Sequence, residues 1–80
     1  MEDKVLDTSG LACPLPLVKA RQEINGMQLN QVLKVVSTDR GSIKDFQGWS
    51  KSAKNVEILK QETENVNGKD IFIHYIKKTS

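Results

Sequence analysis

Apolar residues switch between strand spacing and helix spacing several times within the 80 residues of this chain, and this alternation constrains its fold more than any other feature. The segments 4–8 and 31–37 are short and rich in β-branched residues, as is typical of strands. Between them, apolar residues recur three or four positions apart, as on one face of a helix. These residues are Leu17, Ala20, Ile24 and Met27. The pattern predicts a helix over residues 14–25.

Two prolines stand at the start of this helix, in the segment Cys13-Pro14-Leu15-Pro16. Proline is favoured in the first helical turn, where its missing N–H has no helical partner to lose. A residue before proline is pushed out of the helical region, so in the alternative Leu15 is extended and the helix begins at Pro16. Because both prolines lack a donor, we expect the Leu15 N–H to be the one that meets the Cys13 sulfur.

A second helix is predicted after the strand at 31–37, and Asp39 or Ser42 is placed to cap its N-terminus. Its apolar residues recur at helical spacing and form one face. That face consists of Ile43, Phe46, Trp49 and Ala53.

Two further strands are predicted at 56–60 and 71–76, and Asn67-Gly68 between them is a strong hairpin signal. If these two residues form the whole turn, two glutamates face two isoleucines across the ladder. The pairs are Glu62 with Ile73 and Glu64 with Ile71. Carboxylates match isoleucines poorly, so the register and the loop length stay open at this point.

The order strand-helix-strand-helix-strand-strand predicts one domain over residues 1–80. Crossovers between parallel strands are right-handed, which places both helices on one face of a four-stranded mixed sheet. The fold class is therefore an α/β (α+β) two-layer sandwich of βαβαββ order. The second face of the sheet has no helix to cover it, and we expect a partner to dock there.

Composition excludes several classes of function. The net charge is +2 and no apolar run exceeds three residues, so we expect no membrane span and no direct nucleic-acid binding. The acidic N-terminus lacks a signal-peptide core, and one lone cysteine suits the reducing cytoplasm. One cysteine forms no internal disulfide and no Cys-based zinc site, and no phosphate-binding glycine loop is present, so we expect no metal and no cofactor.

Cys13 is the first candidate for chemistry. It precedes a helix N-terminus, where the positive end of the helix dipole lowers a thiol pKa and raises its reactivity. The alternative is a small buried hydrophobic residue, a common fate of free cysteine. His74 lies within an apolar strand, far in sequence from Cys13, and an ordinary strand histidine is the favoured interpretation.

Trp49 and Phe46 fit a contact surface, but their helical spacing favours the core. Five basic residues form either a patch around the Cys13 end and the second helix or merely solvated helix faces. They are Lys19, Arg21, Lys44, Lys51 and Lys54.

The segment from Leu6 to Pro16 resembles the signature of the TusA/SirA family of sulfur carriers. The matching pattern is Asp7, two residues, Gly10, two residues and then Cys-Pro-x-Pro, with basic residues following at Lys19 and Arg21. The segment 39–46 resembles the second-helix region of the family, including its two aspartates. Chain length and element order agree as well.

The resemblance implies that Cys13 carries sulfane sulfur as a persulfide. A cysteine desulfurase or rhodanese would load it, and an acceptor protein would take the sulfur onward, in tRNA thiolation, sulfur oxidation or cofactor assembly. Turnover as an enzyme and simple carriage fit the sequence equally. The motif implies that Asp7 and Gly10 shape the loop and that Pro14 and Pro16 stiffen it. Partner contacts are expected at Leu15, Lys19, Arg21 and Trp49.

The chain departs from the family pattern at three positions. Members directed to tRNA tend to carry Arg before the cysteine and an acidic residue between the prolines, where this chain has Ala12 and Leu15. Ser50 replaces a second cysteine found in many relatives, so no intramolecular disulfide regulates Cys13. Two other functions stay open: a non-catalytic interaction or regulatory module of a redox complex that uses the uncovered sheet face, and, less favoured, an RNA-binding domain.

Overall fold

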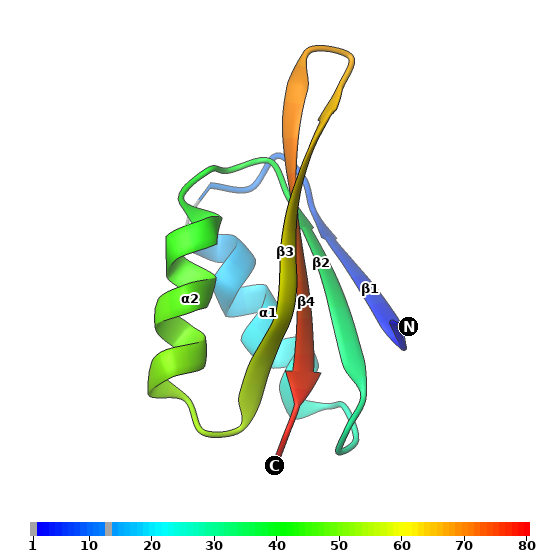
Figure 1. Cartoon of the computed structure of the whole chain (residues 1–80), viewed down its shortest axis with the longest axis vertical. Coiled ribbons are helices and arrows are strands. Elements are labelled where there is room, and N and C mark those ends of the chain that lie inside the picture. The colour runs from blue at the N-terminus through cyan, green and yellow to red at the C-terminus, as the bar shows by residue number, and fades with distance from the viewer. Residues whose placement is uncertain (1, 13) are drawn as a thin grey trace.

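The chain forms two layers, with both helices on the same side of one sheet (Figure 1). The computed structural model describes residues 2–12 and 14–80. The elements, in chain order, are β1 (Lys4–Thr8), α1 (Leu15–Asn25), β2 (Val32–Ser37), α2 (Ser42–Ser52), β3 (Val56–Val66) and β4 (Lys69–Lys78). The predicted two-layer βαβαββ sandwich is confirmed.

The sheet has the strand order β1-β2-β4-β3. β1 and β2 run parallel and the other two pairings are antiparallel, so the sheet is mixed as predicted. The parallel pair puts the C-terminal ends of β1 and β2 at the same edge of the sheet. The segments that lead into α1 and α2 both start from this edge.

The main core lies between the helices and the sheet. Each element except β1 supplies at least one buried apolar residue to it, because each presents one apolar face to the other layer. The buried members are Ala20, Ile24, Met27, Leu33, Val35, Phe46, Val56 and Ile76, and Leu6, Leu17, Trp49, Ala53 and Ile58 pack against them.

Both helices begin close to where the sequence placed them. α1 starts at Leu15, between the two predicted starts, with Pro14 at the N-cap and Pro16 buried in the first turn. The capping prediction for α2 is wrong for Ser42, because Ser42 is the first helical residue and its hydroxyl contacts a buried histidine. Asp39 instead accepts the N–H of Gly41 at 2.8 Å, which fixes the turn that leads into the helix.

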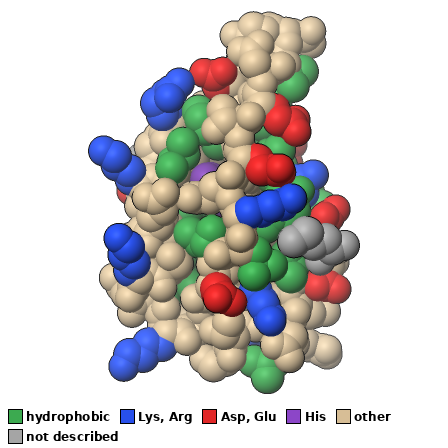
Figure 2. All heavy atoms as spheres, in the orientation of Figure 1, with side chains coloured by type: hydrophobic (Ala, Val, Ile, Leu, Met, Phe, Trp, Pro, Cys, Tyr) green, Lys and Arg blue, Asp and Glu red, His purple; other side chains and the backbone are tan. Residues whose placement is uncertain are grey.

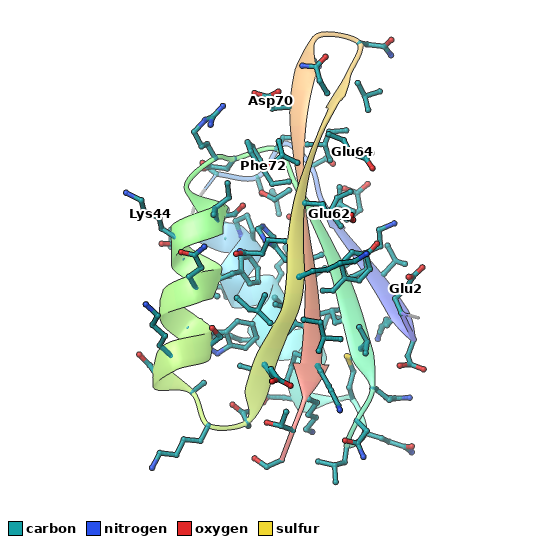
Figure 3. The ribbon with its side chains drawn as sticks, viewed as in Figure 1. Glu2, Lys44, Glu62, Glu64, Asp70 and Phe72 are labelled. Atoms are coloured by element: carbon teal, nitrogen blue, oxygen red, sulfur yellow. The ribbon has the colours of Figure 1, made fainter. Side chains whose placement is uncertain are left out.

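The β3–β4 hairpin is longer than predicted and projects past the rest of the molecule (Figures 1 and 2). Asn67 and Gly68 have φ values of 53° and 81°, the conformation of a two-residue hairpin turn. The register that the sequence left open is the one with glutamates opposite isoleucines. Figure 3 shows Glu62 and Glu64 directed away from the helices. Their carboxylates are tolerated because β3 is an edge strand and this part of it is exposed to water.

A β-bulge at Leu59 explains why the sequence pattern of β3 is hard to interpret. The pairing with β4 shifts by one residue between Ile58 and Lys60. Because side chains alternate along a strand, an extra residue reverses which positions face the helices. Val56 and Ile58 face the core before the bulge, and Gln61 takes that direction after it.

Lysine side chains lie over part of the second face of the sheet, on which no described helix lies. Val32, Ile73 and Tyr75 are at most 8% exposed there. The Lys60 and Lys34 ammonium groups lie 4.8 and 6.0 Å from the centre of the Tyr75 ring, so their alkyl chains shield apolar surface while their charges stay in water. The predicted need for a docked partner on this face is therefore weaker than the topology alone implies.

Candidate functional site

The loop that leads from β1 to α1 is anchored to the end of β2. The buried Thr8 hydroxyl donates to the Val36 carbonyl at 2.6 Å. The Gly10 N–H donates to the Thr38 hydroxyl at 2.8 Å, and the Leu11 N–H donates back to the Thr8 carbonyl at 3.1 Å. These three bonds hold residues 9–12 at the C-terminal edge of the parallel strand pair.

Asp7 and Gly10, the two residues expected to shape this loop, both take part in its turn. The Asp7 carboxylate accepts the Ser9 N–H at 2.9 Å. Hydrogen bonds from the Ser9 side chain and then from its backbone lower the pKa of the Asp7 carboxyl below its ordinary value, because they stabilise the ionised form. Gly10 has φ +83°, a left-handed conformation that favours glycine.

Replacing Gly10 by alanine is expected to lower the free energy of unfolding by about 1 kcal/mol, because a side chain disfavours positive φ. No atom would clash with the added Cβ, so the cost is conformational. Gly48→Ala is the matched control: Gly48 is helical and its Cβ also meets open space, so this change should stabilise by up to about 1 kcal/mol. Urea unfolding of both variants measures the difference, and equal effects would contradict it.

Cys13 itself lies outside the described residues, so its predicted placement stays a prediction. The Leu15 N–H donates to the Ala12 carbonyl at 2.9 Å, and its expected contact with the Cys13 sulfur also lies outside the described residues. This bond joins two residues that flank the Cys13-Pro14 pair in the sequence. Pro14 is exposed, Pro16 is buried, and the Val18 N–H donates to the Pro14 carbonyl at 3.0 Å.

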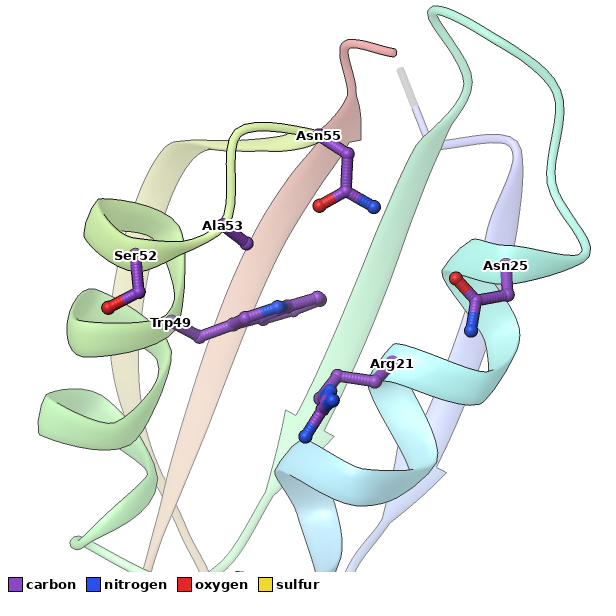
Figure 4. Close-up of a pocket in the computed structure, with 6 residues that line it drawn as sticks. All are labelled: Arg21, Asn25, Trp49, Ser52, Ala53 and Asn55. Carbon is purple, nitrogen blue, oxygen red and sulfur yellow. The ribbon is translucent and has the colours of Figure 1, made fainter.

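The residues expected to contact partners fall into two groups. Leu15 and Lys19 are exposed on α1, and the Leu15 side chain is 47% exposed beside the cysteine position. Arg21 and Trp49 face each other across the two helices and line a cavity of about 400 Å³ (Figure 4). Trp49 also packs on the core, with its ring edge-on to Phe46 at 5.8 Å, so the core prediction for this pair holds as well.

His74 belongs to a buried network that the sequence did not reveal. It is fully buried, and its ring is stacked on Phe46 at 4.5 Å. Its Nε2 lies 2.9 Å from the Ser42 hydroxyl oxygen and its Nδ1 lies 3.0 Å from the Gln61 amide nitrogen. Burial lowers the pKa of His74 to about 4, so the ring is neutral at pH 7.

The network also fixes the tautomer of His74. The Gln61 amide nitrogen is a donor, so Nδ1 accepts and the proton resides on Nε2, which donates to Ser42. The same Gln61 amide donates to the Ile43 carbonyl at 3.2 Å, which binds β3 to the first turn of α2. His74 is thus a structural residue with every ring nitrogen paired.

The described part of the chain contains neither a metal-binding cluster nor a membrane-spanning helix. Within residues 2–12 and 14–80, no group of three His, Cys, Asp or Glu side chains is arranged to hold a metal ion. No helix among the same residues has the length and the apolar character needed to cross a membrane.

Comparison with known proteins yields one consistent family. The family described as "Sulfurtransferase TusA" matches residues 4–78. The sulfur carrier protein TusA of Allochromatium vinosum is 42% identical over 78 residues, which cover 98% of this chain and 95% of that protein. A protein of Halobacterium salinarum, provisionally named a sulfur carrier, is 37% identical over 76 residues, or 95% and 89% of the two chains.

One solved structure supports the fold. The SirA-like protein of Desulfitobacterium hafniense superimposes with a TM-score of 0.67 and covers 91% of this chain and 95% of its own. At 16% sequence identity, this likeness concerns the fold alone.

Proposed function

Because this chain belongs to the TusA family of sulfur carriers, we propose that it holds sulfane sulfur as a persulfide on the thiol of Cys13. The observation that supports this most directly is the Cys-Pro-x-Pro motif in a loop whose preceding residues are anchored by Thr8 and Thr38. Cys13 is also the single cysteine of the chain, so no other thiol is available for this chemistry.

The transfer needs no oxidant or reductant. In loading, the Cys13 thiolate attacks the outer sulfur of a donor persulfide; a new S–S bond forms and the donor S–S bond breaks. The electron pair of the broken bond leaves on the donor cysteine, which becomes a thiolate. In unloading, an acceptor thiolate attacks the outer sulfur on Cys13, and Cys13 leaves as the thiolate.

The residues around the motif have separate supporting roles in this proposal. The N-terminus of α1 favours a negative charge on the thiolate and on the persulfide, because the helix dipole is positive there. Asp7 and Gly10 set the course of the loop, and Pro14 and Pro16 restrict the backbone on the helical side. A stiff loop loses little entropy when a partner thiol approaches.

We propose that the partners are a sulfur-donor protein, of the cysteine desulfurase or rhodanese type, and a sulfur-acceptor protein, and that a single domain over residues 1–80 meets them in the cytoplasm. Leu15 and Lys19 are exposed and could contact a partner beside the loop, and Arg21 and Trp49 could do so at the cavity between the helices.

Arg21→Ala should then raise KM for a protein donor and leave loading by inorganic polysulfide unchanged. An unchanged KM would remove Arg21 from the interface.

Intact-mass measurement tests the carrier function. The protein is incubated with a cysteine desulfurase and cysteine, and a gain of about 32 Da is expected. Two added oxygens have nearly the same mass, so each sample is also treated with dithiothreitol, which removes a persulfide and leaves a sulfinate. No reducible adduct with the desulfurase, with rhodanese and thiosulfate, or with polysulfide would contradict the proposal.

A further inference from the structure

Charge is distributed unequally between the two layers of the molecule. The helical part, residues 14–25 and 39–54, carries six Lys and Arg against three acidic residues, whereas the rest of the chain carries six against seven. The basic residues of the helical part are Lys19, Arg21, Arg40, Lys44, Lys51 and Lys54. The modest net charge of the chain therefore conceals a positive helical layer.

Four of these residues form what we term the basic α2 face: Arg40, Lys44, Lys51 and Lys54. Lys44 and Lys51 are seven residues apart and so lie on the same side of α2, with Arg40 before the helix and Lys54 after it. All four are exposed. Figure 2 shows mainly Lys and Arg along this side of the molecule, and Figure 3 shows Lys44 directed outward from α2.

Acidic residues compensate this face only in part. Of the four basic residues, Arg40 alone has a described ion pair, with Asp70 at 3.1 Å. On α1, Glu23 is bound by Lys4 of β1 at 2.6 Å and does not balance α2. Surfaces that serve only for solubility mix charges of both signs, so a face on which basic residues outnumber acidic ones points to a binding role.

We propose that the basic α2 face docks an acidic surface of the protein that exchanges sulfur with Cys13. This inference rests on the proposed carrier function and adds the chemistry of the partner. The basic α2 face begins next to residues 9–12, the loop that precedes Cys13. Thr38, whose hydroxyl accepts a hydrogen bond from the Gly10 N–H, is two residues before Arg40. A partner seated along α2 therefore reaches the edge of the sheet where residues 9–12 lie.

A protein fits this face better than a nucleic acid does. Proteins that bind single-stranded nucleic acids combine basic residues with exposed aromatic side chains on which bases stack. The two aromatic residues of α2, Phe46 and Trp49, are instead packed against the core. Charge complementarity between proteins acts mainly on the rate of association and weakens with salt, which makes the inference measurable.

The test compares two double variants with the same change in net charge. Lys44→Glu/Lys51→Glu alters the basic α2 face, and Lys69→Glu/Lys77→Glu alters β4 as the control. Sulfur transfer from a cysteine desulfurase supplied with cysteine is measured as kcat/KM at low and high ionic strength. We expect kcat/KM to fall about tenfold or more for the α2 variant at low salt, much less at high salt, and by less than about twofold for the control.

Loading by inorganic polysulfide is measured alongside and separates the two proposals. If wild type accepts no sulfur from polysulfide or from a protein donor, the carrier function fails. If polysulfide loads all variants but the desulfurase reaction slows equally in both, or in neither, the docking inference is overturned. Retained transfer together with salt-sensitive tRNA binding that the α2 variant loses also overturns it. Lys44→Gln/Lys51→Gln, which should give an intermediate rate, guards against misfolding of the charge-reversed variant.

Discussion

Cys13→Ser is expected to accept no sulfur from any donor, while wild type gains a reducible adduct of about 32 Da. A hydroxyl at physiological pH is a far poorer nucleophile than a thiolate and forms no persulfide. The chain has no second cysteine, so no residual transfer is available from another thiol. Intact mass after incubation with a desulfurase and cysteine, with and without dithiothreitol, measures the loss.

The same variant separates the carrier from a non-catalytic interaction module. Serine is close to cysteine in size, so a Cys13 that is presented to partner thiols, as the carrier proposal requires, should show a change within about 0.5 kcal/mol in urea unfolding of the variant. A module that uses the sheet face would keep its biological activity with serine at position 13. A sulfur adduct on Cys13→Ser, or full activity in a strain that depends on the protein, would contradict the carrier function.

The free energy of unfolding is expected to fall by about 3 kcal/mol between pH 7 and pH 4, because His74 is buried as the neutral ring. The pKa of histidine is about 6.5 in the unfolded chain, whereas burial lowers the pKa of His74 to about 4. Below pH 6.5 the unfolded state binds a proton that the folded state cannot bind. The stability is therefore fully present above that pH and is lost as the pH falls toward 4. Urea titrations at half-unit pH intervals measure this slope.

His74→Gln provides the control for this pH dependence. The variant should be less stable at pH 7, because the Ser42 hydroxyl and the Gln61 amide lose a matched partner. Its stability should change far less between pH 6.5 and 4. Asp7 does not interfere, since the lowered pKa of its carboxyl makes stability fall only in more acidic solution. A wild-type slope in His74→Gln would show that other groups cause the loss.

Sequence patterns predicted the elements well where one face of an element is apolar. The helix with Ala20 and Ile24 and the first strand were placed to within a residue or two. The length of β3 was missed because its outer half, from Glu62 onward, is exposed and polar, and because the bulge at Leu59 interrupts its alternation. A bulge follows from three-dimensional pairing with β4, which local residue types do not specify.

The sequence motif of the site was predictable, but the hydrogen bonds that hold its loop in place were not. Gly10 was identified from its place in the motif that resembles the family signature, and its positive φ accords with a role in shaping the loop. The anchors Thr8 and Thr38 carry no sequence signal, because a threonine at or just after the end of a strand has no distinctive pattern until its partner strand is known. The bond from the Leu15 N–H to the Ala12 carbonyl was unpredictable for a related reason: Ala12 has no distinctive side-chain chemistry.

The lysines over Tyr75 imply that charged side chains shield part of the apolar surface of the sheet from water. Lys34 and Lys60 lie over the Tyr75 ring on the side of the sheet where the described residues form no third layer of structure. Surface positions are usually treated as freely exchangeable, yet replacing these lysines by short polar residues would expose the Tyr75 ring to water. Efforts to crystallise the protein by truncating surface lysines should therefore leave these two in place.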